Sequence, residues 1–78
     1  MECKGYILNI GKAARLSNLT VKTVRYYADI GLVKPLRNIS TGYRDFSEDD
    51  LAQLQFISKA RKFNFSIQEC EELLSLYS

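Results

Sequence analysis

The most informative part of this chain is Leu19-Thr20-Val21-Lys22-Thr23-Val24-Arg25-Tyr26-Tyr27. Thr20 is placed to cap a helix, because its hydroxyl can accept a backbone N–H from the first turn. At about 100° per residue, one face of that helix holds Val21, Val24 and Ala28. The other face holds Lys22, Arg25, Tyr26 and Asp29. A helix with these two faces is suited to lie against phosphates and base edges, and the alternative is an ordinary surface helix with solvated cations.

The residues before this stretch predict a first short helix at 10–17. Asn9 is a suitable N-cap, and Ala13 and Ala14 are small enough for close approach of a second helix. The pair Ser17-Asn18 ends this helix, since Asn tolerates the left-handed conformation of a short turn. Helix, short turn and helix in this order predict a helix-turn-helix.

The residues after the stretch predict a basic hairpin. Gly31 is placed to end the second helix, and Pro35 prevents its continuation. Two β-capable segments, 36–39 and 43–46, flank a turn that contains Gly42, which is typical of a hairpin. The arms carry Arg37 and Arg44, so this wing would extend the basic surface. The alternative is an irregular basic loop without strands.

Two capping boxes predict the last two helices. Ser47 with Asp50 opens a third helix, and Ser66 with Glu69 opens a fourth. The expected apolar positions of the third helix are Leu51, Leu54, Ile57 and Ala60, flanked by Phe56 and Phe63. Those of the fourth helix are Ile67, Cys70, Leu73, Leu74 and Tyr77.

The predicted fold class is mainly α, a winged helix-turn-helix of four helices with a small two-stranded β-hairpin wing. We expect residues 1–6 to be a disordered N-terminal segment and residues 7–78 to form the single domain. A chain of 78 residues is near the lower limit for a self-supporting core.

Composition limits the function further. Residues 1–46 carry eight Lys and Arg against three acids, and residues 47–78 carry three against six, which favours one polyanion-facing surface. Cys3 and Cys70 are too few and too far apart for a disulfide framework or a zinc site.

The chain has no histidine and no glycine-rich phosphate loop, so we expect no enzyme. No apolar run approaches a membrane span or a signal peptide, which favours a cytoplasmic protein without a membrane partner.

Five short motifs in this order resemble the N-terminal DNA-binding domain of the mercury-resistance-regulator (MerR) family. They are Ile10-Gly11-Lys12-Ala13-Ala14, Thr23-Val24-Arg25-Tyr26-Tyr27, Gly31-Leu32-Val33-Lys34-Pro35, Gly42-Tyr43-Arg44, and Phe65-Ser66-Ile67-Gln68-Glu69 followed by Leu73-Leu74. The resemblance covers nearly the whole chain. The segment from Phe65 to Tyr77 looks closest to the copper-responsive branch of the family.

The resemblance implies that the second helix enters the major groove of double-stranded promoter DNA and that the wing contacts the backbone. The candidate DNA-binding residues are Lys22, Thr23, Arg25, Tyr26, Arg37, Tyr43 and Arg44. The family also implies a full-length homodimer that acts on RNA polymerase at a distorted promoter. We expect no cofactor in this chain, although a full-length relative would sense a metal ion such as copper.

This sequence departs from the family pattern at several positions. Ala28-Asp29 moves the acidic residue that usually follows the tyrosine pair by one position, and Asn18 and Asn64 stand where Gly is usual. The long dimerisation helix and the effector-binding segment of the family are not present, so we expect this fragment to be a monomer.

Two other functions remain open at this point. An excisionase-like architectural protein would use a similar winged fold to bend DNA in site-specific recombination. A protein-interaction domain would use the acidic fourth helix as its contact surface.

Overall fold

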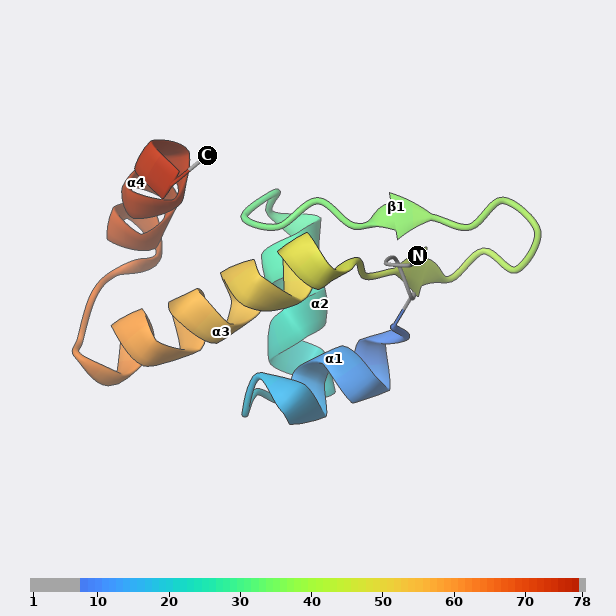
Figure 1. Ribbon diagram of the computed structural model, residues 1–78, viewed down its shortest axis with the longest axis horizontal. Coiled ribbons are helices and arrows are strands. Elements are labelled where there is room, and N and C mark those ends of the chain that lie inside the picture. Colours follow the sequence, from blue (N-terminus) through green and yellow to red (C-terminus); the bar gives the residue numbers. More distant parts are fainter. Residues whose placement is uncertain (1–7, 78) are drawn as a thin grey trace, which may run out of the picture.

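A computed structural model describes residues 8–77. Cys3 and the segment 1–6, which we expected to be disordered, lie outside these residues. Figure 1 shows the order of elements: α1 (Ile10–Leu16), α2 (Val21–Asp29), β1 (Leu36–Arg37), β2 (Arg44–Asp45), α3 (Glu48–Lys62) and α4 (Ile67–Tyr77). The two strands pair antiparallel. The predicted winged helix-turn-helix is therefore confirmed.

The turn between α1 and α2 is built by side chains that the sequence marked. The Asn9 side chain accepts the Lys12 backbone N–H at 2.8 Å, and the Thr20 hydroxyl accepts that of Thr23 at 3.1 Å. Each cap satisfies a backbone donor that has no partner within its helix. Asn18 takes the predicted left-handed conformation, with φ of 60°. Both helix starts and the turn between them are confirmed.

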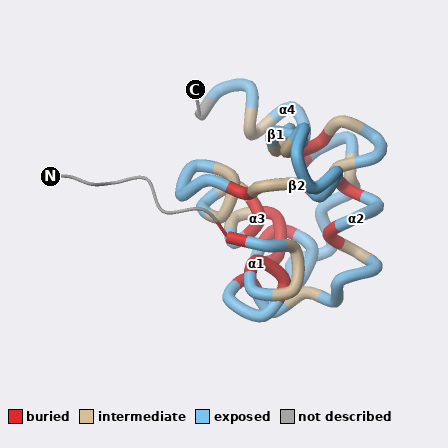
Figure 2. The backbone as a smooth tube through the Cα atoms, turned by 90° about the vertical axis from the view of Figure 1, so that its right-hand side faces the viewer, coloured by how far each residue is buried: buried red, intermediate tan, exposed pale blue. Residues whose placement is uncertain are grey.

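The core lies where α1, α2 and α3 meet, as the buried segments in Figure 2 show. Its fully buried side chains include Val24, Val33, Phe46, Leu54, Ile57 and Cys70. The predicted apolar face of α2 needs one correction, because Val21 is 37% exposed and Tyr27 is only 5% exposed. Burying the aromatic ring of Tyr27 removes more apolar surface from water than burying Val21 would. The helix is therefore turned about its axis so that Tyr27, and not Val21, faces the core.

The wing is a short but well-organised hairpin. Leu36 pairs with Asp45 and Arg37 with Arg44. The Asn38 side chain accepts the backbone N–H groups of Ser40 and Thr41, and Gly42 takes a φ of 78°. These bonds exclude the irregular loop. The strands are shorter than expected, because Leu36 and Ile39 are 79% and 99% exposed and have no core to pack against.

The base of the wing is joined to the segment before α1. Leu8 and Phe46 form an antiparallel bridge in which each backbone N–H donates to the other residue's carbonyl oxygen at 2.9 Å. Both side chains are buried. The wing is therefore fixed to the helical core at the end of β2.

Both predicted capping boxes are present. At Ser47 and Asp50, and again at Ser66 and Glu69, each side chain bonds the other residue's backbone N–H. Phe63 does not flank the core as expected, since it lies at the C-terminus of α3 and is 76% exposed. In α4, Cys70 is fully buried, and Ile67 and Leu74 pack against the core. The Tyr77 side chain lies outside the described part of the chain.

Candidate nucleic-acid interface

The exposed face of α2 carries three of the seven candidate DNA-binding residues: Lys22, Arg25 and Tyr26. Tyr26 is 51% exposed. Its ring lies 6.0 Å from that of the buried Tyr27, with an angle of 50° between the planes. Such tilted ring pairs are favourable, so the core side of α2 helps to direct the Tyr26 ring outward.

Thr23 occupies a different environment from its neighbours. It is half-buried, and its hydroxyl accepts the hydroxyl proton of Thr20 at 2.8 Å. Its backbone N–H is already used by the same cap. Thr23 is thus a candidate DNA contact that also takes part in the cap of α2. The sequence pattern did not indicate this second role.

The cationic side chains of the wing converge with α2 on one cleft, which we call the arginine cleft. It has a volume of about 470 Å³. Its lining residues are Asn9, Ile10, Arg25, Arg37, Gly42, Tyr43 and Arg44. The structure therefore brings four of the seven candidate residues, from α2 and the wing, to one place beside the start of α1.

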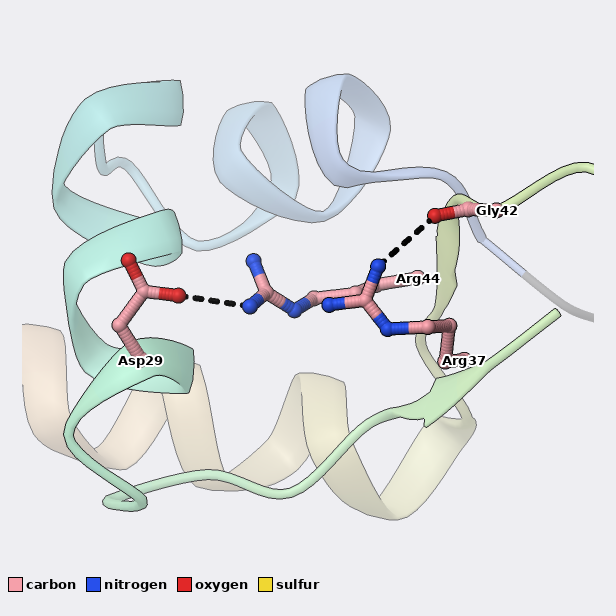
Figure 3. A network of polar contacts seen from close by, with 4 residues as sticks. All are labelled: Asp29, Arg37, Gly42 and Arg44. Atoms are coloured by element: carbon pink, nitrogen blue, oxygen red, sulfur yellow. Dashed lines mark hydrogen bonds and ion pairs between the residues drawn. The ribbon is translucent and has the colours of Figure 1, made fainter.

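Two of these arginines are held by neighbouring groups, as Figure 3 shows. Arg37 donates an Nη1 proton to the Gly42 carbonyl oxygen at 3.0 Å, within the wing. Arg44 reaches across to α2, where its Nη2 lies 2.6 Å from Asp29 Oδ1. The Arg44 side chain is 22% exposed and that of Asp29 is 53% exposed.

The electrostatics of the arginine cleft suit an anion. Three guanidinium groups line it, and the Asp29 carboxylate balances one of them. Guanidinium groups bind phosphate through two parallel hydrogen bonds, and Tyr43, which is 75% exposed, adds a hydroxyl at the rim. An anion approaching from solvent would find donors from α2 and the wing together.

Sequence reasoning missed two parts of this site. Asn9 was assigned only to helix capping, yet it also lines the arginine cleft together with Ile10. Asp29 was placed on the outward face of α2 but had no assigned partner. A pairing between α2 and the wing joins residues far apart in sequence, so no local pattern could have found it.

Other site types have little support in the described residues. Within residues 8–77, no group of three or more His, Cys, Asp or Glu could hold a metal ion. Burial raises the pKa of the Cys70 thiol, so this cysteine is a poor nucleophile. No helix in this part of the chain is long and apolar enough to cross a membrane.

Comparison with known proteins gives a consistent result. Residues 8–76 match the family described as MerR HTH family regulatory protein. The chain is 47% identical over 70 residues to the HTH-type transcriptional regulator HmrR of Rhizobium leguminosarum bv. viciae, covering 90% of this chain and 54% of that protein. The chain thus spans about half the length of this relative.

Two crystal structures also match. A MerR-family regulator from Bacillus cereus superposes with a TM-score of 0.80 at 32% identity, covering 88% of this chain and 52% of that one. The regulator PbrR691 of Ralstonia metallidurans CH34, solved in complex with lead(II), gives a TM-score of 0.78 at 28% identity. That match covers 90% of this chain and 55% of PbrR691.

Proposed function

This chain belongs to the MerR family and corresponds to its helix-turn-helix domain, and we propose that it binds duplex DNA with α2 in the major groove and the wing on the phosphate backbone. Residues 7–78 would form this domain. Lys22 and Tyr26 would reach base edges, with Thr23 beside them. Arg25, Arg37, Tyr43 and Arg44 would meet phosphates.

The observation that carries the proposal is the arginine cleft beside the exposed face of α2. Phosphate contacts fix the position and orientation of a protein on the duplex, while contacts with base edges supply the specificity. Here the two kinds of side chain lie on adjoining surfaces: the guanidinium groups line the cleft, and Lys22 and Tyr26 project from α2. A helix that enters the major groove would bring the wing to the neighbouring backbone.

The relatives narrow the class of function. They are transcriptional regulators, which are not enzymes, and this class of protein does not favour the excisionase-like alternative. We further propose that a regulator built on this domain acts as a homodimer on promoter DNA with RNA polymerase. Its response would be to a heavy-metal ion such as copper, and the lead(II) complex of PbrR691 supports that ligand class.

A salt titration of DNA binding tests the proposal. If the three arginines meet phosphates, the logarithm of the binding constant should fall with the logarithm of salt concentration with a slope of about −3. Fluorescence anisotropy of a labelled random duplex provides the measurement. A slope near zero, or no binding at low salt, would refute DNA binding through this surface.

A second experiment tests sequence specificity. The 78-residue chain is used to enrich duplexes from a random pool, and the enriched duplex is then compared with unselected DNA. We expect a reproducible short motif with tighter binding than the unselected pool. Enrichment of no motif, despite salt-dependent binding, would leave only a non-specific DNA-binding protein.

A further inference from the structure

The ion pair between Arg44 and Asp29 connects the wing directly to α2 (Figure 3). Arg44 lies on β2, and Asp29 is the last residue of α2. The bridge between Leu8 and Phe46 fixes the wing at its base, whereas this ion pair holds the wing through Arg44, a residue that lines the arginine cleft. The wing therefore has two attachments, one of them next to the proposed phosphate contacts.

Asp29 stands where a carboxylate does little for the helix. The C-terminus of a helix carries partial negative charge, so an acid in the last turn of α2 is unfavourable by itself. The last turn of α2 contains no basic residue that would offset it. The cation that pairs with Asp29 is Arg44 on the wing. An exposed ion pair of this kind adds little to the free energy of unfolding. Asp29 is thus poorly explained as a stabilising residue.

The geometry of the pair suggests another role. A guanidinium group has five N–H donors in a rigid plane, and the Arg44 Nη2 atom is bonded to Asp29. Fixing one edge of the plane sets the direction of the remaining donors. It also sets the distance between the wing and α2, since the two residues are on these two elements.

On the basis of the proposed function, we propose that Asp29 is a positioning residue for sequence-specific DNA binding: it holds the Arg44 guanidinium so that the wing meets a phosphate while α2 is seated in the groove. In a specific complex both contacts must be made in one register. In a non-specific complex a mobile Arg44 can still find a phosphate. Asp29 then contributes to the preference for the correct site and not to general DNA affinity.

The test compares Asp29→Asn with Asp49→Asn in the 78-residue chain. Both variants change an exposed aspartate to its amide and raise the net charge equally, but Asp49 lies in the first turn of α3 and has no ion-pair partner within residues 8–77. The two probes are a duplex enriched by the wild-type chain and an unselected duplex. Circular dichroism confirms that each variant is folded.

We expect Asp29→Asn to lose about two- to fivefold in affinity for the enriched duplex relative to Asp49→Asn, as fits an exposed ion pair. Affinity for the unselected duplex should match that of the Asp49→Asn control. Asp29→Glu, which keeps the carboxylate, should recover part of the loss. In an Arg44→Gln background, Asp29→Asn should cause no further loss.

Other outcomes overturn the proposal in distinguishable ways. Tighter binding of both duplexes than the control would mean that Asp29 only repels phosphates. If Asp29→Asn and Asp49→Asn bound both duplexes equally well, Asp29 would have no positioning role, although DNA binding would stand. The same would follow if Asp29→Asn lost as much affinity for the enriched duplex in the Arg44→Gln background as in the wild type. Failure of the wild-type chain to bind any duplex would refute the proposed function and this inference with it.

Discussion

The cations of the proposed interface differ in how they are held. Within the described part of the chain, Lys22 and Arg25 have no hydrogen-bond or ion-pair partner, whereas Arg37 and Arg44 each have one. The free Lys22 side chain can adapt to a base edge and the free Arg25 side chain to a phosphate, whereas a fixed arginine on the wing is suited to one phosphate position. The two groups should therefore respond differently to substitution.

Lys22→Ala should reduce binding to the enriched duplex more than to unselected DNA, because a lost base contact removes discrimination of about 1–3 kcal/mol. Arg44→Ala removes a phosphate contact from both complexes and should weaken both, with a further loss of only about two- to fivefold at the enriched duplex, because Asp29 then has no guanidinium to hold. Anisotropy titrations of both duplexes with each variant provide the measurement. Tyr26→Phe, which removes only the hydroxyl, is expected to follow Lys22→Ala. If Lys22→Ala showed no greater loss at the enriched duplex, relative to unselected DNA, than Arg44→Ala does, the assignment of α2 as the reading helix would be wrong.

Cys70 predicts a pH dependence of stability. Burial raises the pKa of its thiol above the ordinary value of 9.0, while Arg61 opposes the rise and Glu69 adds to it. The folded state therefore favours the neutral thiol. Its stabilising contribution is present below the ordinary pKa and is lost as the pH rises through the folded value.

Urea unfolding of the wild-type chain and Cys70→Ala should reveal this contribution. The free-energy difference between the two proteins should be constant near neutral pH and should shrink above about pH 9. All other titratable groups are common to both proteins, so their contribution cancels in the difference. A difference that stays constant to high pH would mean that the Cys70 thiol is not desolvated as the structure indicates.

Among the elements, those defined by local chemistry were the most predictable. The caps at Asn9 and Thr20, and both capping boxes, depend on residues within three positions of each other, and all are present. The order of helices and wing follows from these signals. The strand lengths and the exposure of Phe63 did not follow, because they depend on which side chains meet the core.

The site was less predictable than the fold. The basic face of α2 could be read from helical spacing alone, and Lys22, Arg25 and Tyr26 are exposed as expected. The arginine cleft and the pairing of Arg44 with Asp29 depend on how the wing is placed against α2. That placement arises from packing between distant segments, on which sequence periodicity gives no information.

The turn between α1 and α2 contains a residue in an unfavourable backbone region, with Asn18 at φ of 60°. A left-handed conformation costs most L-residues roughly 1–2 kcal/mol, and Asn less. Asn18→Ala should therefore lower the free energy of unfolding by about 1 kcal/mol, and Asn18→Gly should change it little. Urea unfolding followed by circular dichroism measures both variants.

Gln68→Ala is a suitable control for this comparison, because Gln68 is exposed within α4. It should leave stability within about 0.5 kcal/mol of the wild type. If Asn18→Ala and Asn18→Gly were equally stable, the backbone conformation of the turn would not be what limits the choice of residue there.

For the molecule as a whole, the distribution of apolar surface predicts the oligomeric state. Leu54, Ile57 and Cys70 are fully buried within one chain, and Leu74 packs against them. Of the strongly exposed apolar residues, Phe63 and Leu76 lie at the ends of different helices, and Leu36 and Ile39 lie on the wing. Isolated exposed residues of this kind do not form an association surface.

We therefore predict a monomer at micromolar concentration, measured by multi-angle light scattering. Leu76→Glu should change neither the mass nor the thermal midpoint, because Leu76 is 82% exposed. A dimer that Leu76→Glu dissociates would show that α4 carries an interface. Leu73 would then be a candidate for the same surface, since it is only half-buried and lies outside the core cluster.

The bridge between Leu8 and Phe46 closes a single loop that contains α1, α2 and the whole wing. Joining two residues so far apart in sequence carries a loop-closure entropy that the two backbone hydrogen bonds alone do not offset. The bridge becomes favourable once the helices between its ends have docked, since only then is there a core to bury both side chains. Contacts between distant residues form late for this reason. We therefore expect the wing arginines to acquire their places late in folding. Their order then depends on the docking of α1, a helix that carries none of the seven candidate DNA-binding residues.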